Sequence, residues 1–139
     1  MNAFKPISVQ ILAALTFLWI CSCNYTHTYT PDFNGKKATV LDSINGKYAF
    51  ENIQIQGKTI SGTGGTNSTL IIRFINGKNL PTDTSKIVAL AQQLAHQVKS
   101  IVKNPKAIEN FNVYFDTKTV NGDSTTTQSI EMAFKAENI

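Results

Sequence analysis

The stretch TDTSKIVALAQQLAHQVKSIVKN, residues 82–104, predicts the one long helix around which we expect the fold to be built. Its apolar residues recur at spacings of three and four, so they share one stripe along a helix. Thr82 or Asp83 can accept hydrogen bonds from the free N–H groups of the first turn. Asn104 followed by Pro105 ends the helix. The stripe that we expect to be buried contains Ile87, Leu90, Ala91, Leu94, Val98, Ile101 and Val102.

The sequence before this helix alternates between apolar and polar residues and is interrupted by turn-forming residues. This pattern is typical of antiparallel strands joined by hairpins. In the segment 47–56 the apolar residues change parity between Phe50 and Ile53, which predicts a bulge or bend near residues 51–52. The strands expected here are Ala38 to Asp42, Lys47 to Gln56, Lys58 to Gly62 and Ser68 to Ile75, with turns at Asn45-Gly46, at Gly57 and at residues 62–67.

Two more strands are expected after the helix, Glu109 to Lys118 and Thr125 to Lys135, joined by a hairpin that contains Asn121-Gly122. The strand over 68–75 has apolar residues on both faces, which is typical of a central strand. One amphipathic helix can cover one face of such a sheet. The predicted fold class is therefore α+β, an antiparallel sheet of about five to six strands with one long amphipathic helix on one face and the other face partly open.

The N-terminal residues have a different character. Lys5 supplies a positive charge, and Ile7 to Ile20 is an apolar run of 14 residues. A membrane-spanning helix needs roughly 20 such residues, so this run has the length of a secretory signal segment. The end of this run and the residues after it, Ile20-Cys21-Ser22-Cys23, resemble the lipobox of bacterial lipoproteins. The lipobox has an aliphatic residue, a position that tolerates different residues, a small residue and then the cysteine.

This resemblance implies that residues 1–22 are a lipoprotein signal peptide, cut between Ser22 and Cys23, and that Cys23 carries a diacylglyceryl thioether. The lipid bilayer is then a partner through the acylated Cys23, because two or more acyl chains hold a protein firmly on a membrane. Asn24 is not the aspartate that enteric bacteria read as an inner-membrane retention signal. The resemblance thus favours the outer membrane of the cell envelope, in a cell that has one. The alternative is an uncleaved N-terminal anchor with incidental cysteines.

The rest of the chain predicts one tether and one domain. Residues 23–36 comprise the lipidated cysteine and a polar stretch with Pro31 and Gly35 as breakers, which we interpret as a flexible tether. Tyr25, His27 and Tyr29 alternate with threonines, so a short strand is the alternative. Residues 37–139 are long enough for a single hydrophobic core and are expected to form one α+β domain.

Charge argues against nucleic acid as a partner. The whole chain has a formal charge of +4, and removal of residues 1–22 takes away Lys5, leaving 12 basic and 9 acidic residues. The chain has one arginine, Arg73, so it is poorly supplied for bidentate contacts with phosphate. The glycine-rich residues 62–65 run into a predicted strand rather than a helix, unlike a phosphate-binding loop.

Catalytic and metal-binding patterns are equally sparse. His27 lies in the predicted tether and His96 on the polar side of the predicted helix, where its neighbours are glutamines and a serine. Neither histidine has the partners that a nucleophile or a zinc site needs. A hydrolase that uses surface carboxylates is a weaker alternative, since no carboxylate pair has a recognisable spacing. We therefore expect no enzyme activity, no metal and no cofactor.

One patch is a candidate for binding. Tyr114 has the opposite parity to Phe111, Val113 and Phe115, so it should project from the other face of the sheet, beside Asn112 and Asp116. The sequence thus predicts a non-enzymatic, membrane-anchored envelope lipoprotein that binds a protein, a peptide or a glycan. The alternative is a structural or assembly accessory of a larger envelope complex.

Overall fold

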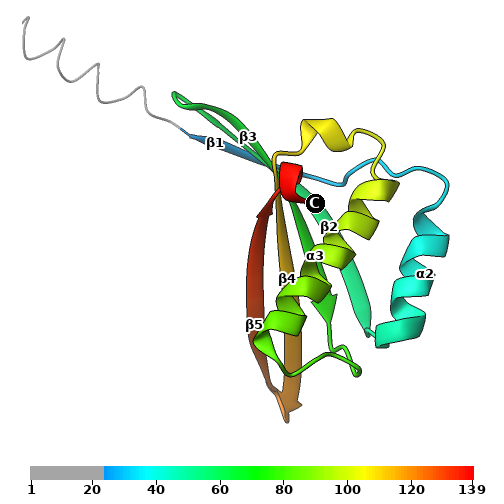
Figure 1. Ribbon diagram of the computed structural model, residues 1–139. Helices are drawn as coiled ribbons and strands as arrows, with labels where there is room; N and C mark the ends of the chain where they lie inside the picture. Colours follow the sequence, from blue (N-terminus) through cyan, green and yellow to red (C-terminus); the bar gives the residue numbers. More distant parts are fainter. Residues whose placement is uncertain (1–23) are drawn as a thin grey trace, which may run out of the picture.

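The computed structural model describes residues 24–139, which form a five-stranded sheet with two α-helices on one face (Figure 1). The predicted signal peptide and Cys23 lie outside the described residues. None of the helices within residues 24–139 has the length and apolar character that crossing a bilayer requires.

The strands lie in the sheet in the order in which they occur along the chain. All neighbouring pairs are antiparallel except β3 and β4, which are parallel. The predicted α+β class is confirmed, but the expectation of an entirely antiparallel sheet is wrong at this pair. Parallel neighbours need a crossover connection, which the long helix provides. The strands are β1 (Tyr25–Tyr29), β2 (Asn52–Gly62), β3 (Gly65–Ile75), β4 (Asn110–Asn121) and β5 (Ser124–Lys135).

The crossover helix α3 (Thr84–Ile101) confirms the predicted helix, but it ends three residues before the predicted stop at Asn104, because Val102 is extended and pairs with Phe33. Asp83 is its N-cap, and the carboxylate accepts hydrogen bonds from the Lys86 N–H and the Ser85 hydroxyl. These bonds, with that from Ser85 the larger cause, lower the pKa of Asp83. All seven residues of the predicted apolar stripe are buried, as is Ala95. A short 3₁₀ turn, η1 (Pro105–Ala107), follows the helix, and a second one, η2 (Ala136–Asn138), follows β5.

A second helix, α2 (Lys37–Tyr48), occupies the segment for which we predicted a strand over 38–42 and a turn at Asn45-Gly46. The prediction of a single helix is therefore wrong. Ile44 is buried against the core, and Val40, Leu41 and Tyr48 pack around it. These positions are three, four and eight residues apart, so they face the core only when the backbone is helical.

The change of parity between Phe50 and Ile53 marks the boundary between α2 and β2, not a bulge. The C-cap of α2 is Ala49, whose backbone is left-handed with φ of 49° and whose N–H donates to the Asn45 carbonyl. β2 begins at Asn52 and continues without a turn through Gly57. Gly57 has another role, because the ring of Tyr29 lies directly over it, where a β-carbon would overlap the ring.

Strand β1 replaces part of the predicted tether. Tyr25–Tyr29 pairs with β2 over Gly57–Ser61, so the alternative of a short strand is the one that the structure shows. The chain between β1 and α2 is also held in place. It forms two backbone hydrogen bonds with the end of α3 and the residues after it. The Asn34 N–H donates to the Ile101 carbonyl, and the Lys103 N–H donates to the Asp32 carbonyl. Residues 25–34 are therefore part of the folded domain.

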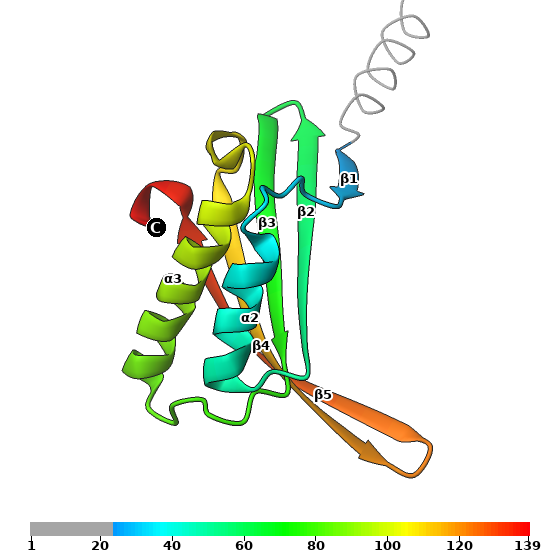
Figure 2. The same cartoon turned by 90° about the vertical axis from the view of Figure 1, so that its right-hand side faces the viewer.

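The two helices lie in front of the sheet in Figure 2, and the core lies between them and the sheet. Leu70, Ile72 and Phe74 of β3 are fully buried, and Phe111, Val113 and Phe115 of β4 lie beside them. The rings of Phe50 and Phe115 pack on Phe74, with centroids 4.8 and 5.6 Å away. At the lower end of Figure 2 the hairpin of β4 and β5 projects beyond the helices. Its outer residues, 117–131, are all exposed.

Candidate functional site

The face of the sheet opposite α2 and α3 carries mostly polar side chains, and we call it the open face. Its positions alternate with those of the core and lie in register across β2, β3, β4 and β5. In the described part of the chain, no helix covers it (Figure 1). Its four transverse rows are Asn52, Ile75, Asp116 and Ser129; Gln54, Arg73, Tyr114 and Glu131; Gln56, Ile71, Asn112 and Ala133; and Lys58, Thr69, Asn110 and Lys135.

The three predicted binding residues, Asn112, Tyr114 and Asp116, all lie on the open face. The predicted orientation of Tyr114, opposite to Phe111, Val113 and Phe115, is thus confirmed. These three residues form a connected network with side chains from β3 and β5. We call Arg73, Asn112, Tyr114, Asp116, Ser129 and Glu131 the Arg73 patch.

Asp116 is the buried anchor of this patch. Its side chain is 3% exposed, and one carboxylate oxygen accepts a hydrogen bond from Arg73 Nη1 at 2.9 Å. The other oxygen accepts a hydrogen bond from the Ser129 hydroxyl at 2.6 Å. A buried carboxylate needs such partners, because burial without them would cost several kcal/mol. Asp116 therefore positions Arg73 and is not free to contact a partner directly.

Tyr114 occupies the centre of the patch. The Arg73 guanidinium lies over its ring, 4.2 Å from the centroid, and its hydroxyl donates to Glu131 Oε1 at 2.5 Å. The Asn112 amide donates to the same oxygen at 3.1 Å. One ring face is thus covered by the cation, and the ring is fixed in orientation. Burial, followed by the hydrogen bond to Glu131, raises the pKa of the Tyr114 phenol above its usual 10.0.

This raised pKa leads to a prediction for alkaline pH. Because the folded state favours the neutral phenol, the stability from Tyr114 is complete below pH 10. It is lost as the pH rises through the raised pKa of the folded state. Tyr114→Phe should remove a component that titrates above pH 10 from the tyrosinate absorbance curve and make stability less dependent on pH there. An unchanged titration curve in Tyr114→Phe would contradict the assignment.

The patch is suited to recognition by hydrogen bonds. It presents guanidinium and amide donors from Arg73 and Asn112 beside the carboxylate of Glu131. Gln54 and Gln56 add two exposed amides on β2. Both oxygens of Asp116 are engaged, so it is not available as a general base. The arrangement thus offers donors and acceptors on a broad surface rather than a nucleophile and a base in a cleft.

The histidines and acidic residues do not converge on a reactive centre. His27 stacks between Tyr25 and Tyr29, with ring centroids 6.5 and 6.1 Å away, and His96 is exposed on α3. Within residues 24–139, no three histidine, cysteine, aspartate or glutamate side chains form a group that could hold a metal ion.

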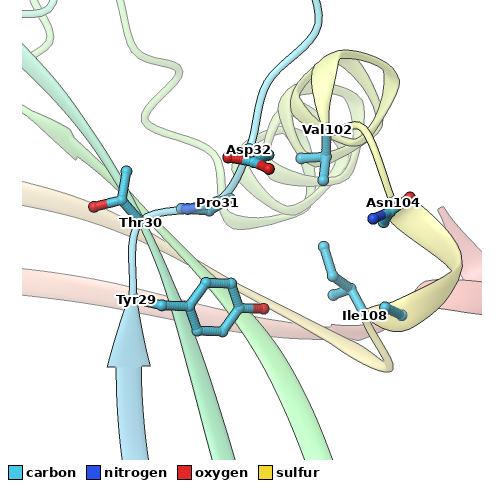
Figure 3. A pocket seen from close by; sticks show the side chains of 8 residues that line it. Tyr29, Thr30, Pro31, Asp32, Val102, Asn104 and Ile108 are labelled. Atoms are coloured by element: carbon cyan, nitrogen blue, oxygen red, sulfur yellow. The ribbon is translucent and has the colours of Figure 1, made fainter.

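A cavity of about 320 Å³ lies apart from the patch, where the chain after β1 meets the end of α3 (Figure 3). The Tyr29 ring points across it toward Ile108, and Val102 and Asn104 close the far side. Asp32 is the one charged residue of the lining, and the lining holds no histidine or cysteine. The cavity follows from the docking of β1, so sequence reasoning that treated this segment as a tether missed it.

Comparison with protein-family models, with curated proteins and with solved structures finds no match to this chain. The site is therefore interpreted from its own geometry. Sequence reasoning missed Arg73, Ser129 and Glu131 as members of the patch. The alternation of residues 68–75 indicates on which face of the strand Arg73 lies. Its position beside Asp116 depends on the parallel pairing of β3 with β4.

Proposed function

We propose that this chain is a membrane-anchored envelope lipoprotein whose domain is a non-enzymatic binding module for an envelope protein, peptide or glycan. The observation that carries the binding proposal is the open face, with the Arg73 patch at its centre. Arg73, Tyr114 and Glu131 come from three different strands and are held in fixed orientations by one another. Ordered side chains lose little conformational entropy when a partner binds, which favours affinity.

The anchor is supported by the lipobox resemblance at Ile20-Cys21-Ser22-Cys23. The acyl chains would concentrate the domain at the surface of a membrane. Asn24 after the lipobox favours the outer membrane as this membrane. The mild positive charge and the single arginine do not favour nucleic acid as a partner.

A structural or assembly role is the second candidate, and the edge strand β5 favours it. β5 is twelve residues long and has no neighbour on its outer side among the described residues. Unpaired backbone groups along an edge strand can pair with a strand of another chain. Ile130, 52% exposed, adds an apolar side chain on the other face of this strand.

Photo-crosslinking in intact cells tests the binding proposal. A benzophenone side chain replaces either Gln54, exposed on the open face, or Gln93, exposed on α3 and serving as the matched control. We expect an adduct of one defined mass from position 54 and much less from position 93. A benzophenone at Ile130 of β5 tests the second candidate, and an adduct from position 130 but not from position 54 would favour the assembly role instead.

A charge reversal provides the second arm of this experiment. Glu131→Lys changes the carboxylate in the patch and should reduce the adduct from position 54 several-fold. Glu137→Lys makes the same change at an exposed site in η2 and should leave the adduct unchanged. Equal adducts in the two variants would overturn the assignment of binding to the Arg73 patch.

A further inference from the structure

The start of β1 lies against the turn between β2 and β3. Tyr25 pairs with Ser61, so Asn24 lies beside Gly62, at the point where the hairpin turns. A β-carbon on Gly62 would overlap the side-chain oxygen of Asn24, so the absence of a side chain there allows this close approach. The beginning of the described chain and the β2–β3 turn are therefore in direct contact.

We propose that the β2–β3 turn, residues 62–65, lies on the lipid headgroups of the membrane to which the chain is anchored. This inference rests on the proposed acylation of Cys23. Cys23 precedes Asn24 directly, and consecutive Cα atoms are about 3.8 Å apart. A flexible tether of residues 24–36 would instead allow an end-to-end distance of roughly 20 Å. Because β1 begins at Tyr25, that separation is not available to the folded domain.

The chemistry of the turn suits a headgroup layer. Residues 59–69, TISGTGGTNST, contain no charged side chain, so the turn would not be repelled by lipid phosphates. The segment 62–67 is exposed throughout and carries hydroxyl and amide groups that can hydrogen-bond to headgroups. The nearest charged residue along β2 is Lys58, whose positive charge is attracted to phosphate.

Tyr25 is an independent sign of an interface. It lies two residues after Cys23, and its side chain is 66% exposed despite its apolar ring. Tyrosine is enriched at membrane–water boundaries, because the ring enters the apolar layer while the hydroxyl stays hydrated. In β1, Tyr25 thus occupies the position next to the anchor at which an interfacial side chain is expected.

This contact would orient the whole domain. The β2–β3 turn and the β4–β5 turn lie at opposite ends of the sheet (Figure 2). Thr69 is in register with Asn110, so Asn121 lies fifteen residues beyond the level of Gly65 along the strand direction. At about 3.3 Å per residue this is roughly 50 Å before the twist of the sheet is considered. The strands would then run perpendicular to the membrane surface. The open face would point sideways, neither toward the membrane nor away from it.

Fluorescence quenching tests the orientation. Thr63→Cys and Thr126→Cys each place one free thiol in the acylated protein, from which residues 1–22 have been cut, at the β2–β3 turn and in the distal hairpin. Both threonines are exposed, so neither change should disturb folding. Each thiol is labelled with a small fluorophore, and the protein is bound to phosphatidylcholine and phosphatidylglycerol vesicles that carry a nitroxide on the lipid headgroup. We expect several-fold stronger quenching at position 63 than at position 126.

Equal quenching at the two positions, or stronger quenching at position 126, would overturn the proposed orientation. Intact-mass analysis and co-sedimentation with the vesicles, carried out first, distinguish this failure from a failure of the anchor. A protein without acyl chains that does not sediment refutes the lipoprotein proposal and with it this inference. A protein that is acylated and sediments, but is not quenched at position 63, refutes the orientation alone.

Discussion

Cys23→Ser is expected to release the protein from membranes. A serine hydroxyl cannot form the thioether that the lipobox resemblance implies at this position, so the variant would carry no acyl chain there. Each buried methylene stabilises attachment by about 0.8 kcal/mol, and two or three chains bury many of them. The parent should therefore sediment with membranes, and the variant should lose most of this association. Fractionation followed by intact-mass analysis measures both effects.

Cys21→Ser is the matched control for this experiment. Cys21 lies two residues before Cys23, at a position where the lipobox tolerates different residues, so membrane association should not change. Two results would contradict the lipoprotein proposal. One is a Cys23→Ser protein that stays in the membrane as the parent does, and the other is an intact mass that shows Met1 still attached to the parent.

Phe74→Ala is expected to lower the free energy of unfolding by about 3–5 kcal/mol. Phe74 is fully buried in the central strand β3, and its ring packs against those of Phe50 and Phe115. Removing the ring loses apolar burial and leaves a cavity that its neighbours fill only in part. The loss is a large fraction of the 5–15 kcal/mol that typically stabilises a domain.

Thermal unfolding followed by circular dichroism measures this loss. At roughly 4 °C per kcal/mol, the melting temperature of Phe74→Ala should fall by about 12–20 °C. Val88→Ala also removes apolar atoms, but the side chain is 41% exposed on α3, so its effect should stay within about 0.5 kcal/mol. If Phe74→Ala and Val88→Ala melted at the same temperature, the position of Phe74 in the core would be wrong.

The sequence predicts best where the signal is local. The apolar spacing of residues 87–101 lies within α3, and the cap at Asp83 directly precedes it; the structure agrees with both. The β4–β5 hairpin is likewise local, because its strands are joined by a short turn that contains Gly122, with φ of 60°. A period or a turn of this kind is specified by neighbouring residues and needs no distant partner.

Helix α2 and strand β1 show where this reasoning fails. In α2 only Ile44 is fully buried, and the Asn45-Gly46 pair favours a turn over a helix. The helix exists because its partly apolar side packs against the core shared with α3. Strand β1 is equally weak on its own, and it is ordered by pairing with β2 and by the fit of Tyr29 over Gly57. Tertiary packing overrides weak local preference in both segments.

The candidate site divides in the same way. Period-two alternation within β4 placed Asn112, Tyr114 and Asp116 on one face, because alternate side chains of a strand point the same way. Arg73 is 43 residues before Asp116, and Glu131 is 17 residues after Tyr114. Their contact with β4 requires the strand order and the register of the sheet.

By itself, the sequence determined the crossover helix, the last hairpin and the face on which Tyr114 lies, since each follows from the period of a continuous segment. Only the tertiary structure decided the parallel pairing of β3 with β4, the joining of β1 to the sheet and the contact of Arg73 with Asp116 and Tyr114. The physical reason is that strand pairing satisfies backbone hydrogen bonds between segments far apart in the chain. Many registers satisfy these bonds equally well, and burial of the whole core selects among them.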